Sequence, residues 1–255
     1  MEITLVQASL QWENPEANRQ HLQNLISLVR EGTGLVVLPE MFSTGFTMNP
    51  GEVAEPVGGP TTKWMKAIAK EKNCAVTGSV AITEGDHYYN RLLFVFPDGQ
   101  LKYYDKRHLF TLAGEDKVFT AGRERPVIEY QGWKICPLIC YDLRFPVFSR
   151  NTEDYDLLLY VANWPAPRIQ AWDVLLQARA IENMCYVAGV NRIGQDGNGH
   201  NYPGHSQVYD TLGNPMLEIS ENEGIYSVTL SKEAVSDTRK RFGFLNDRDR
   251  FTLLY

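Results

Sequence analysis

Apolar residues follow two periods along this chain, and segments with the two periods alternate. After the helix-start signal Asn14-Pro15, apolar residues recur at the spacing of one helix face as far as Gly32, which predicts a helix there. The next segment, 34–39, is a continuous apolar run closed by proline, which is typical of a strand buried between helix layers. Further helices are predicted over 60–72, 168–184 and 231–240. Further strands are predicted over 3–10, 74–82, 88–96, 127–130, 133–139, 155–162, 185–191, 206–209, 215–219 and 224–230, and from the turn at 97–99 to about residue 104.

Strands and helices alternate in the first quarter of the chain and again from about 134 to 190, and hairpins separate these parts. This order predicts an α/β sandwich with two mixed sheets inside and helices outside. We find no repeat, linker or break in composition, and therefore predict one domain over 1–255. The segment 106–122 is long and irregular, which is typical of a functional loop, and 194–204 reads as a glycine-rich surface loop.

The bulk composition narrows the function classes. With 44% hydrophobic and 22% charged residues the chain reads as a globular protein, and its net charge of −6 gives no basic footprint, so we expect no nucleic-acid partner. The four cysteines (74, 136, 140 and 185) are too few and too scattered for a disulfide scaffold or a zinc site. No apolar run is long enough to span a bilayer, and the first residues lack the pattern of a signal peptide. We expect a cytoplasmic protein without a metal or a membrane partner.

Three reactive side chains each come directly after a predicted strand: Glu40, Lys106 and Cys140. Ligands collect at strand ends of α/β sheets, and a charge placed there is costly unless it is used. Cys140 also stands where a strand gives way to a helix start, and we expect backbone N–H groups and the helix dipole to favour its thiolate. Each residue has an ordinary alternative: Cys140 as a core residue, Glu40 as a surface acid, and Lys106 as one cation of a basic run.

Together, the three side chains suit acyl transfer. The carboxylate can take the thiol proton, and the ammonium can hold the developing oxyanion charge. A cysteine–histidine pair with His108 or His205 as the base is an open alternative. No G-x-S-x-G elbow, Walker loop or G-x-G-x-x-G motif appears, so serine hydrolase and nucleotide-binding functions are not indicated.

With these residues in view, the chain resembles the nitrilase superfamily of carbon–nitrogen hydrolases. Leu-Pro-Glu40-Met-Phe is similar to the family's general-base motif, and Tyr104-Asp-Lys106-Arg-His-Leu-Phe110 to its lysine motif. Cys140-Tyr-Asp-Leu-Arg-Phe-Pro146 is similar to its nucleophile motif, although Val147 stands where members often have glutamate. Asn163-Trp-Pro, the segment 178–183 and Gly204-His-Ser extend the resemblance over nearly the whole chain.

The resemblance implies a four-layer α-β-β-α sandwich, a homodimer and no cofactor. It also implies a second glutamate after the lysine motif, which maps onto Glu115, with Asp116 as the alternative. The Asn-Trp-Pro-Ala-Pro-Arg segment from Asn163 and the C-terminal Phe-Leu-Asn-Asp-Arg look most like bacterial ω-amidases, which release ammonia from 2-oxoglutaramate or 2-oxosuccinamate. The tail, about 241–255, is expected to pack on the domain or on a dimer partner.

The expected reaction begins when Glu40 removes the proton of Cys140, and the thiolate attacks the substrate carbonyl. Lys106 and the backbone N–H of Tyr141 are expected to bind the oxyanion, and Glu115 to orient Lys106.

The predicted substrate-binding residues are Phe46 and Trp164 as apolar walls, Asn163, and Arg168 for a distal carboxylate. Arg144 is expected to be structural, paired with Asp142 or another acid. Alternative functions are an N-carbamoyl amino acid amidohydrolase, a nitrilase, and a non-catalytic scaffold on the same fold.

Overall fold

The computed structural model describes residues 1–253. Its helices are α1 Pro15–Ser27, α2 Pro50–Val53, α3 Pro60–Lys72, α4 Ile169–Asn183 and α5 Lys232–Phe242. Its strands are β1 Glu2–Gln7, β2 Leu35–Val37, β3 Glu55–Pro56, β4 Ala75–Glu84, β5 His87–Val95, β6 Leu101–Asp105, β7 Ile128–Tyr130, β8 Trp133–Ile139, β9 Leu157–Ala162, β10 Tyr186–Asn191, β11 Ile193–Gln195, β12 Asn201–Pro203, β13 Gln207–Tyr209 and β14 Gly224–Thr229. Short 3₁₀ helices span Thr111–Ala113, Glu115–Lys117, Cys140–Arg144, Ala166–Arg168 and Phe244–Asp247.

Most strands belong to two mixed sheets. The seven-stranded sheet has the order β14-β1-β2-β4-β5-β6, with β3 paired to β4, and the five-stranded sheet has the order β13-β10-β9-β8-β7. The central strands β1, β2 and β4 run parallel, as do β8, β9 and β10, and the short β3 is parallel to β4. The other pairings, which involve β14, β5, β6, β13 and β7, are antiparallel. Parallel strands place their C-terminal ends at a common edge of a sheet, and chemistry-bearing residues follow β2 and β8 there.

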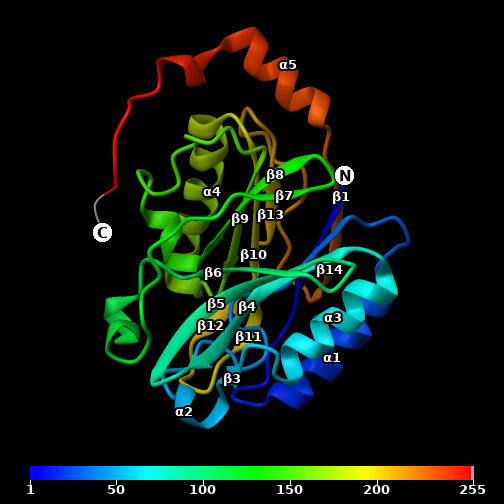
Figure 1. Cartoon of the computed structure of the whole chain (residues 1–255), viewed down its shortest axis with the longest axis vertical. Helices are drawn as coiled ribbons and strands as arrows, with labels where there is room; N and C mark the ends of the chain where they lie inside the picture. Colours follow the sequence, from blue (N-terminus) through cyan, green and yellow to red (C-terminus); the bar gives the residue numbers. More distant parts are fainter. Residues whose placement is uncertain (254–255) are drawn as a thin grey trace.

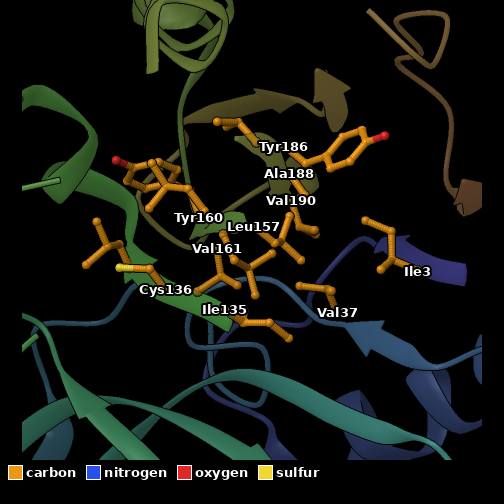
Figure 2. Close-up of a cluster of buried hydrophobic side chains, with 14 of the residues drawn as sticks. Ile3, Val37, Ile135, Cys136, Leu157, Tyr160, Val161, Tyr186, Ala188 and Val190 are labelled. Carbon is orange, nitrogen blue, oxygen red and sulfur yellow. The ribbon is translucent and has the colours of Figure 1, made fainter. Parts of the chain in front are cut away.

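The sheets pack face to face between layers of helices (Figure 1). Successive side chains of β2 point to opposite faces of the sheet. Leu35 and Val37 join the core between the sheets, whereas Val36 joins the cluster beneath α1 and α3. Figure 2 shows Val37 and Ile3 beside side chains of the five-stranded sheet such as Ile135. With α4 on the far side of that sheet, the predicted α-β-β-α sandwich is confirmed.

Local signals set the helix ends. The Asn14 side chain accepts a hydrogen bond from Ala17 N at 3.1 Å, and Pro15 occupies the first turn of α1. Helix α4 lies very close to β10, because a Cβ built on Gly189 would come within 2.5 Å of Leu176. Glycine is required there so that the helix can approach the strand.

Three details differ from the prediction. Segment 215–219 is not a strand, since it makes only an isolated bridge between Tyr209 and Pro215; the proline has no N–H to donate, and the chain then turns to the surface. The predicted surface loop 194–204 contains the hairpin of β11 and β12. The short helix α2 was not predicted from the sequence.

The chain beyond β14 leaves the sandwich. Helix α5 projects from it, and the tail then passes back alongside the domain (Figure 1). Arg248 pairs with Asp154 at 2.8 Å, and Leu253 packs against the large hydrophobic cluster that includes both sheets and α4. The last two residues of the predicted tail lie outside the described residues. Within 1–253, no helix is long and apolar enough to cross a membrane.

Candidate active site

The three strand-end residues singled out from the sequence meet at one place between the sheets. Lys106 Nζ lies 2.9 Å from Glu40 Oε1, and both side chains are fully buried. The Asn163 backbone N–H donates to Glu40 Oε2 at 2.8 Å, and the carbonyl of the same residue lies 4.0 Å from Cys140 Sγ. Because β2 and β6 belong to one sheet and β8 to the other, the group forms only when the two sheets pack together.

A second carboxylate completes the buried group. Glu115 lies on a 3₁₀ turn of the long loop after β6, with its Oε2 2.8 Å from Lys106 Nζ. The Phe110 backbone N–H donates to the same oxygen at 2.6 Å. Asp116, the alternative weighed from the sequence, is exposed. Glu115 is therefore the residue that enters the site.

Burial and mutual charge set the protonation of this group. Burial lowers the pKa of Lys106, but the carboxylates of Glu115 and Glu40 outweigh it and raise that pKa above its usual value, so the ammonium stays charged. Burial raises the pKa of Glu115, and Lys106 opposes that rise. The charged ammonium thus lies between the two carboxyl groups and opposes the effect of burial on Glu115.

Asn90, which the sequence reasoning missed, connects the two carboxylates. Its Nδ2 donates to Glu40 Oε1 at 2.8 Å and to Glu115 Oε1 at 3.1 Å. Its Oδ1 accepts from Ser79 Oγ at 2.8 Å, and Ser79 Oγ accepts from the Met41 backbone at 2.9 Å. The available signal was a serine and an asparagine inside otherwise apolar strands, where an unpaired polar group would be costly.

Cys140 stands in a strained backbone conformation at the end of β8. Its φ of 45° lies in the left-handed region, which costs a non-glycine residue about 1–3 kcal/mol. The expectation that its surroundings favour the thiolate is wrong for the resting protein. Burial and the charge of Glu40 raise the pKa of the thiol well above its usual value, against the opposing effect of Lys106. The helix that follows is only a five-residue 3₁₀ segment, too short for a strong dipole.

The predicted pairing of Arg144 with Asp142 is also wrong. The Arg144 guanidinium lies 5.0 Å from the Trp164 ring centroid and lines the cavity described below. Asp142 is buried and instead accepts hydrogen bonds from Tyr104, Ile139 and His108.

The two histidines considered as alternative bases have other partners. His108 Nδ1 lies 2.8 Å from Asp142 Oδ1, and its ring stacks on Phe145. His205 Nδ1 lies 3.0 Å from Asp173 Oδ2. Neither residue lines the cavity that reaches Cys140. The structure therefore gives the cysteine–histidine alternative no support.

A cavity of about 650 Å³ opens above Cys140. Phe46, Asn163, Trp164 and Arg168, predicted to bind substrate, line it together with Tyr141. Sequence reasoning missed the other lining residues: Trp12, Glu13, Thr47, Met48, Asn49, Phe110, Leu112, Ala113, Arg144, Pro165, Asp196, Asn198, His200 and Tyr202. Several of them come from the β11–β12 hairpin, which had no chemical motif to mark it. Among residues 1–253, no group of three or more histidine, cysteine, aspartate or glutamate side chains could hold a metal ion.

Comparison with known proteins decides the family. A model of the carbon–nitrogen hydrolase family matches residues 2–240. The chain belongs to the carbon–nitrogen hydrolase family. This hydrolase is 46% identical over 255 residues to the omega-amidase YafV of Yersinia enterocolitica, and the match covers 100% of this chain and 99% of the relative. It is 33% identical over 250 residues to the 2-oxoglutaramate amidase of Bacillus subtilis, covering 96% of each.

A solved structure from the family agrees with the fold. A CN-hydrolase superfamily protein from Xanthomonas campestris, which carries an arsenic adduct in its active site, is 46% identical and superposes with a TM-score of 0.97. The match covers 99% of this chain and 98% of that one. The resemblance to the nitrilase superfamily and the prediction of an amidase with ω-amidases as relatives are confirmed.

Proposed function

We propose that this carbon–nitrogen hydrolase is an ω-amidase that releases ammonia from 2-oxoglutaramate or 2-oxosuccinamate through a thioester on Cys140. One observation carries the residue roles: a charged lysine lies between two carboxylates beneath the half-buried thiol of a cavity. The substrate class rests on the relatives, one an omega-amidase and another a 2-oxoglutaramate amidase.

Hydrogen-bond capacity supports Glu40 as the base. Each carboxylate oxygen can accept about two hydrogen bonds. Both oxygens of Glu115 are filled, Oε1 by Asn90 and Lys106 and Oε2 by Lys106 and Phe110 N. Glu40 Oε1 is filled as well, whereas Oε2 accepts one short hydrogen bond, from Asn163 N at 2.8 Å, and one long, weak hydrogen bond, from Asn163 Nδ2 at 3.5 Å. Glu40 Oε2 therefore retains the capacity to take the thiol proton.

The acylation step starts from the protonated thiol of Cys140. Because the Cys140 thiol is neutral at rest, its proton moves to Glu40 as the sulfur attacks the amide carbonyl. The new C–S bond forms as the carbonyl π electrons move to oxygen. The Lys106 ammonium and the Tyr141 N–H stabilise that oxyanion, and one such donor is typically worth about 3–4 kcal/mol. Collapse breaks the C–N bond, and protonated Glu40 gives its proton to the leaving ammonia.

Deacylation reuses the same groups. Glu40 removes a proton from water, and the hydroxide adds to the thioester carbonyl. Lys106 stabilises the second oxyanion, which collapses to break the C–S bond. The proton returns to the sulfur, so the carboxylic acid leaves and the neutral thiol is restored.

The cavity wall supports a substrate with an anionic end. Arg168 and Arg144 both line it, and Arg168 lies 5.1 Å from the Phe110 ring centroid. A guanidinium beside aromatic walls suits a small carboxylate. We assign the distal carboxylate to Arg168, with Phe46 and Trp164 as walls and Asn163 beside the reacting amide.

We further propose a cytoplasmic homodimer without a cofactor. The reaction above needs only side chains and water. Val174 and Ile181 on α4 and the nearby Leu212 leave large apolar side chains about half exposed, and a second copy can cover such a surface. Sedimentation of the purified protein at micromolar concentration distinguishes a dimer from a monomer.

Ammonia release from a substrate panel tests this function. We expect fast release from 2-oxoglutaramate and 2-oxosuccinamate and little from N-carbamoyl amino acids or simple nitriles. Cys140→Ala should abolish turnover with little change in thermal unfolding, whereas Cys74→Ala, beneath α3 and away from the cavity, should retain it. Turnover by Cys140→Ala would contradict the thioester, and a preference for N-carbamoyl amino acids or nitriles would reassign the substrate.

A further inference from the structure

We propose that Asp142 is a positioning residue that sets the geometry between Lys106 and Cys140, an inference that rests on the proposed function. Asp142 is fully buried and does not line the cavity, so it does not touch substrate. Its carboxylate nevertheless bonds the chain on both sides of Lys106 and directly before Cys140. It accepts from Tyr104 and His108, which flank Lys106, and from Ile139, which precedes Cys140.

The carboxylate is fully used in this arrangement. Oδ2 accepts from Tyr104 OH at 2.7 Å and from Ile139 N at 3.0 Å. Oδ1 lies 3.0 Å from the His108 backbone N and 2.8 Å from its ring Nδ1. Tyr104 OH in turn accepts from the Arg107 N–H at 2.9 Å, next to Lys106. Four contacts fill the acceptor capacity of a carboxylate.

These bonds cross the boundary between the two sheets. Lys106 follows β6 of the seven-stranded sheet, and Cys140 follows β8 of the five-stranded sheet. Apolar packing holds the sheets together but tolerates small displacements, whereas charge-assisted hydrogen bonds fix distance and direction. Asp142 is thus placed to fix the position of Lys106, the oxyanion donor, relative to Cys140, the nucleophile on the other sheet.

The same carboxylate supports the strained turn of Cys140. The Ile139 N–H bonds the side chain three residues ahead, which closes a tight turn around Cys140 with its φ of 45°. Tyr141, whose backbone N–H the proposed reaction uses, directly precedes Asp142 in the same 3₁₀ turn. Loss of the carboxylate therefore disturbs the nucleophile and the oxyanion donors together.

Asp142→Asn is the sharpest variant. It keeps the shape of the side chain but replaces one acceptor oxygen with a donor NH₂ group. In one orientation the NH₂ faces the backbone N–H of Ile139, and in the other it faces that of His108. Neither backbone group can turn round, so one of them always loses its acceptor.

Asp156→Asn is a matched control, because Asp156 is also buried and bonds the opposite end of β8. Its Oδ2 accepts from Lys134 N at 2.9 Å, far from Cys140 along the same strand. Both variants remove a buried carboxylate that bonds β8, but only Asp142 adjoins the reacting groups. Assays are run below the unfolding transitions of both proteins.

With 2-oxoglutaramate, we expect Asp142→Asn to lower kcat about a hundredfold, as displacements near 1 Å do, and to change KM less than threefold. Asp156→Asn should lower the unfolding temperature and keep kcat within threefold. If Asp142→Asn does not fold, Tyr104→Phe removes one bond and should lower kcat about tenfold. A kcat within threefold of wild type in Asp142→Asn, or in Tyr104→Phe as its replacement, overturns the proposal.

Alkylation of Cys140 by iodoacetamide separates this inference from the proposed function, because it needs no substrate. If the wild-type protein does not hydrolyse 2-oxoglutaramate, the proposed function fails while the positioning role is still tested. We expect the alkylation rate to fall at least tenfold in Asp142→Asn, because the thiol loses its alignment with Glu40, and to be unchanged in Asp156→Asn. Equal rates in all three proteins overturn the positioning role.

Discussion

One buried cation lies in the cavity floor and another lies behind the cavity rim, and the two cations are held in different ways. In the floor (Glu40, Asn90, Lys106, Glu115 and Cys140), carboxylates surround Lys106 and raise its pKa. Behind the rim (Trp12, Phe46, Arg168 and the β11–β12 hairpin), the Arg192 guanidinium donates to the backbone carbonyls of Leu10, Ile193 and Gln195, and burial lowers its pKa.

This difference suits Lys106 to a chemical role and Arg192 to a structural one. Carbonyl dipoles orient a guanidinium and hold loops in place, but they supply no full negative charge. Two carboxylates keep an ammonium charged in a dry site, where it can stabilise a developing oxyanion. The floor is therefore expected to control kcat and the rim to control substrate binding.

Lys106→Met should give the largest effect. It keeps most of the side-chain volume but removes the ammonium, so we expect kcat to fall about a thousandfold. It also leaves two buried carboxylates without a cation, and the free energy of unfolding should fall by about 3–5 kcal/mol. Steady-state kinetics and urea unfolding measure the two quantities. A rise in KM at unchanged kcat would contradict the oxyanion role.

The rate of Cys140 alkylation should rise about a hundredfold between pH 7 and pH 9. Because burial and Glu40 raise the pKa of the thiol, it stays neutral below its raised pKa, and the reactive thiolate grows about tenfold per pH unit. Mass spectrometry of iodoacetamide-treated protein measures the rate at each pH. A plateau reached below pH 7 would show instead that Cys140 is a preformed thiolate.

Asn90→Ala should weaken the floor without removing a charge. Both Glu40 and Glu115 lose a hydrogen bond, which should lower the free energy of unfolding by about 1–3 kcal/mol and kcat by about tenfold. Ser79→Ala, one bond further from the carboxylates, is the matched control and should change kcat less. Equal kcat losses in the two variants would argue against a direct effect on the carboxylates.

Arg168→Ala tests the rim through substrate binding. Loss of a charged hydrogen bond to the distal carboxylate should raise KM for 2-oxoglutaramate at least tenfold, with kcat within about threefold of wild type. A simple primary amide without a carboxylate serves as the control substrate, and its kcat/KM should not change. An equal loss with both amides would remove Arg168 from carboxylate recognition.

Arg192→Met should give the smallest effect on turnover, and it is the counterpart of Lys106→Met. The carbonyls of Leu10, Ile193 and Gln195 lose a donor, so the free energy of unfolding should fall by about 1–3 kcal/mol. We expect a modest rise in KM and an unchanged kcat. A kcat loss as large as that of Lys106→Met would erase the distinction between floor and rim.

The sequence identified most of the floor because its residues have local signals. Glu40, Lys106 and Cys140 each follow a strand that is recognisable from an apolar run, and a charged residue there is unusual enough to notice. Asn90 escaped because one polar residue within a strand does not reveal which carboxylates it will bond. The partners of Asp142 escaped for the same reason, since they lie on another sheet and an adjacent arginine offered a simpler pairing.

The rim was harder to predict because loops set it. Trp164 and Arg168 were found from the Asn-Trp-Pro-Ala-Pro-Arg segment, and Phe46 was proposed as an apolar wall. Trp12 and the β11–β12 hairpin carry no motif and reach the cavity only through the fold. The pKa of Cys140 was misjudged for a related reason. Local sequence indicates a strand end, but burial and the distance to Glu40 depend on the packing of both sheets.

Acid-quench mass spectrometry during turnover of 2-oxoglutaramate tests the central claim most directly. The account predicts a 2-oxoglutaryl thioester on the peptide that contains Cys140 and no adduct on Cys74, Cys136 or Cys185, which are buried away from the cavity. The adduct should appear within the first turnover and be absent in Cys140→Ala. Ammonia release at the full rate without acylation of Cys140, or with the acyl group on another residue, would contradict the account.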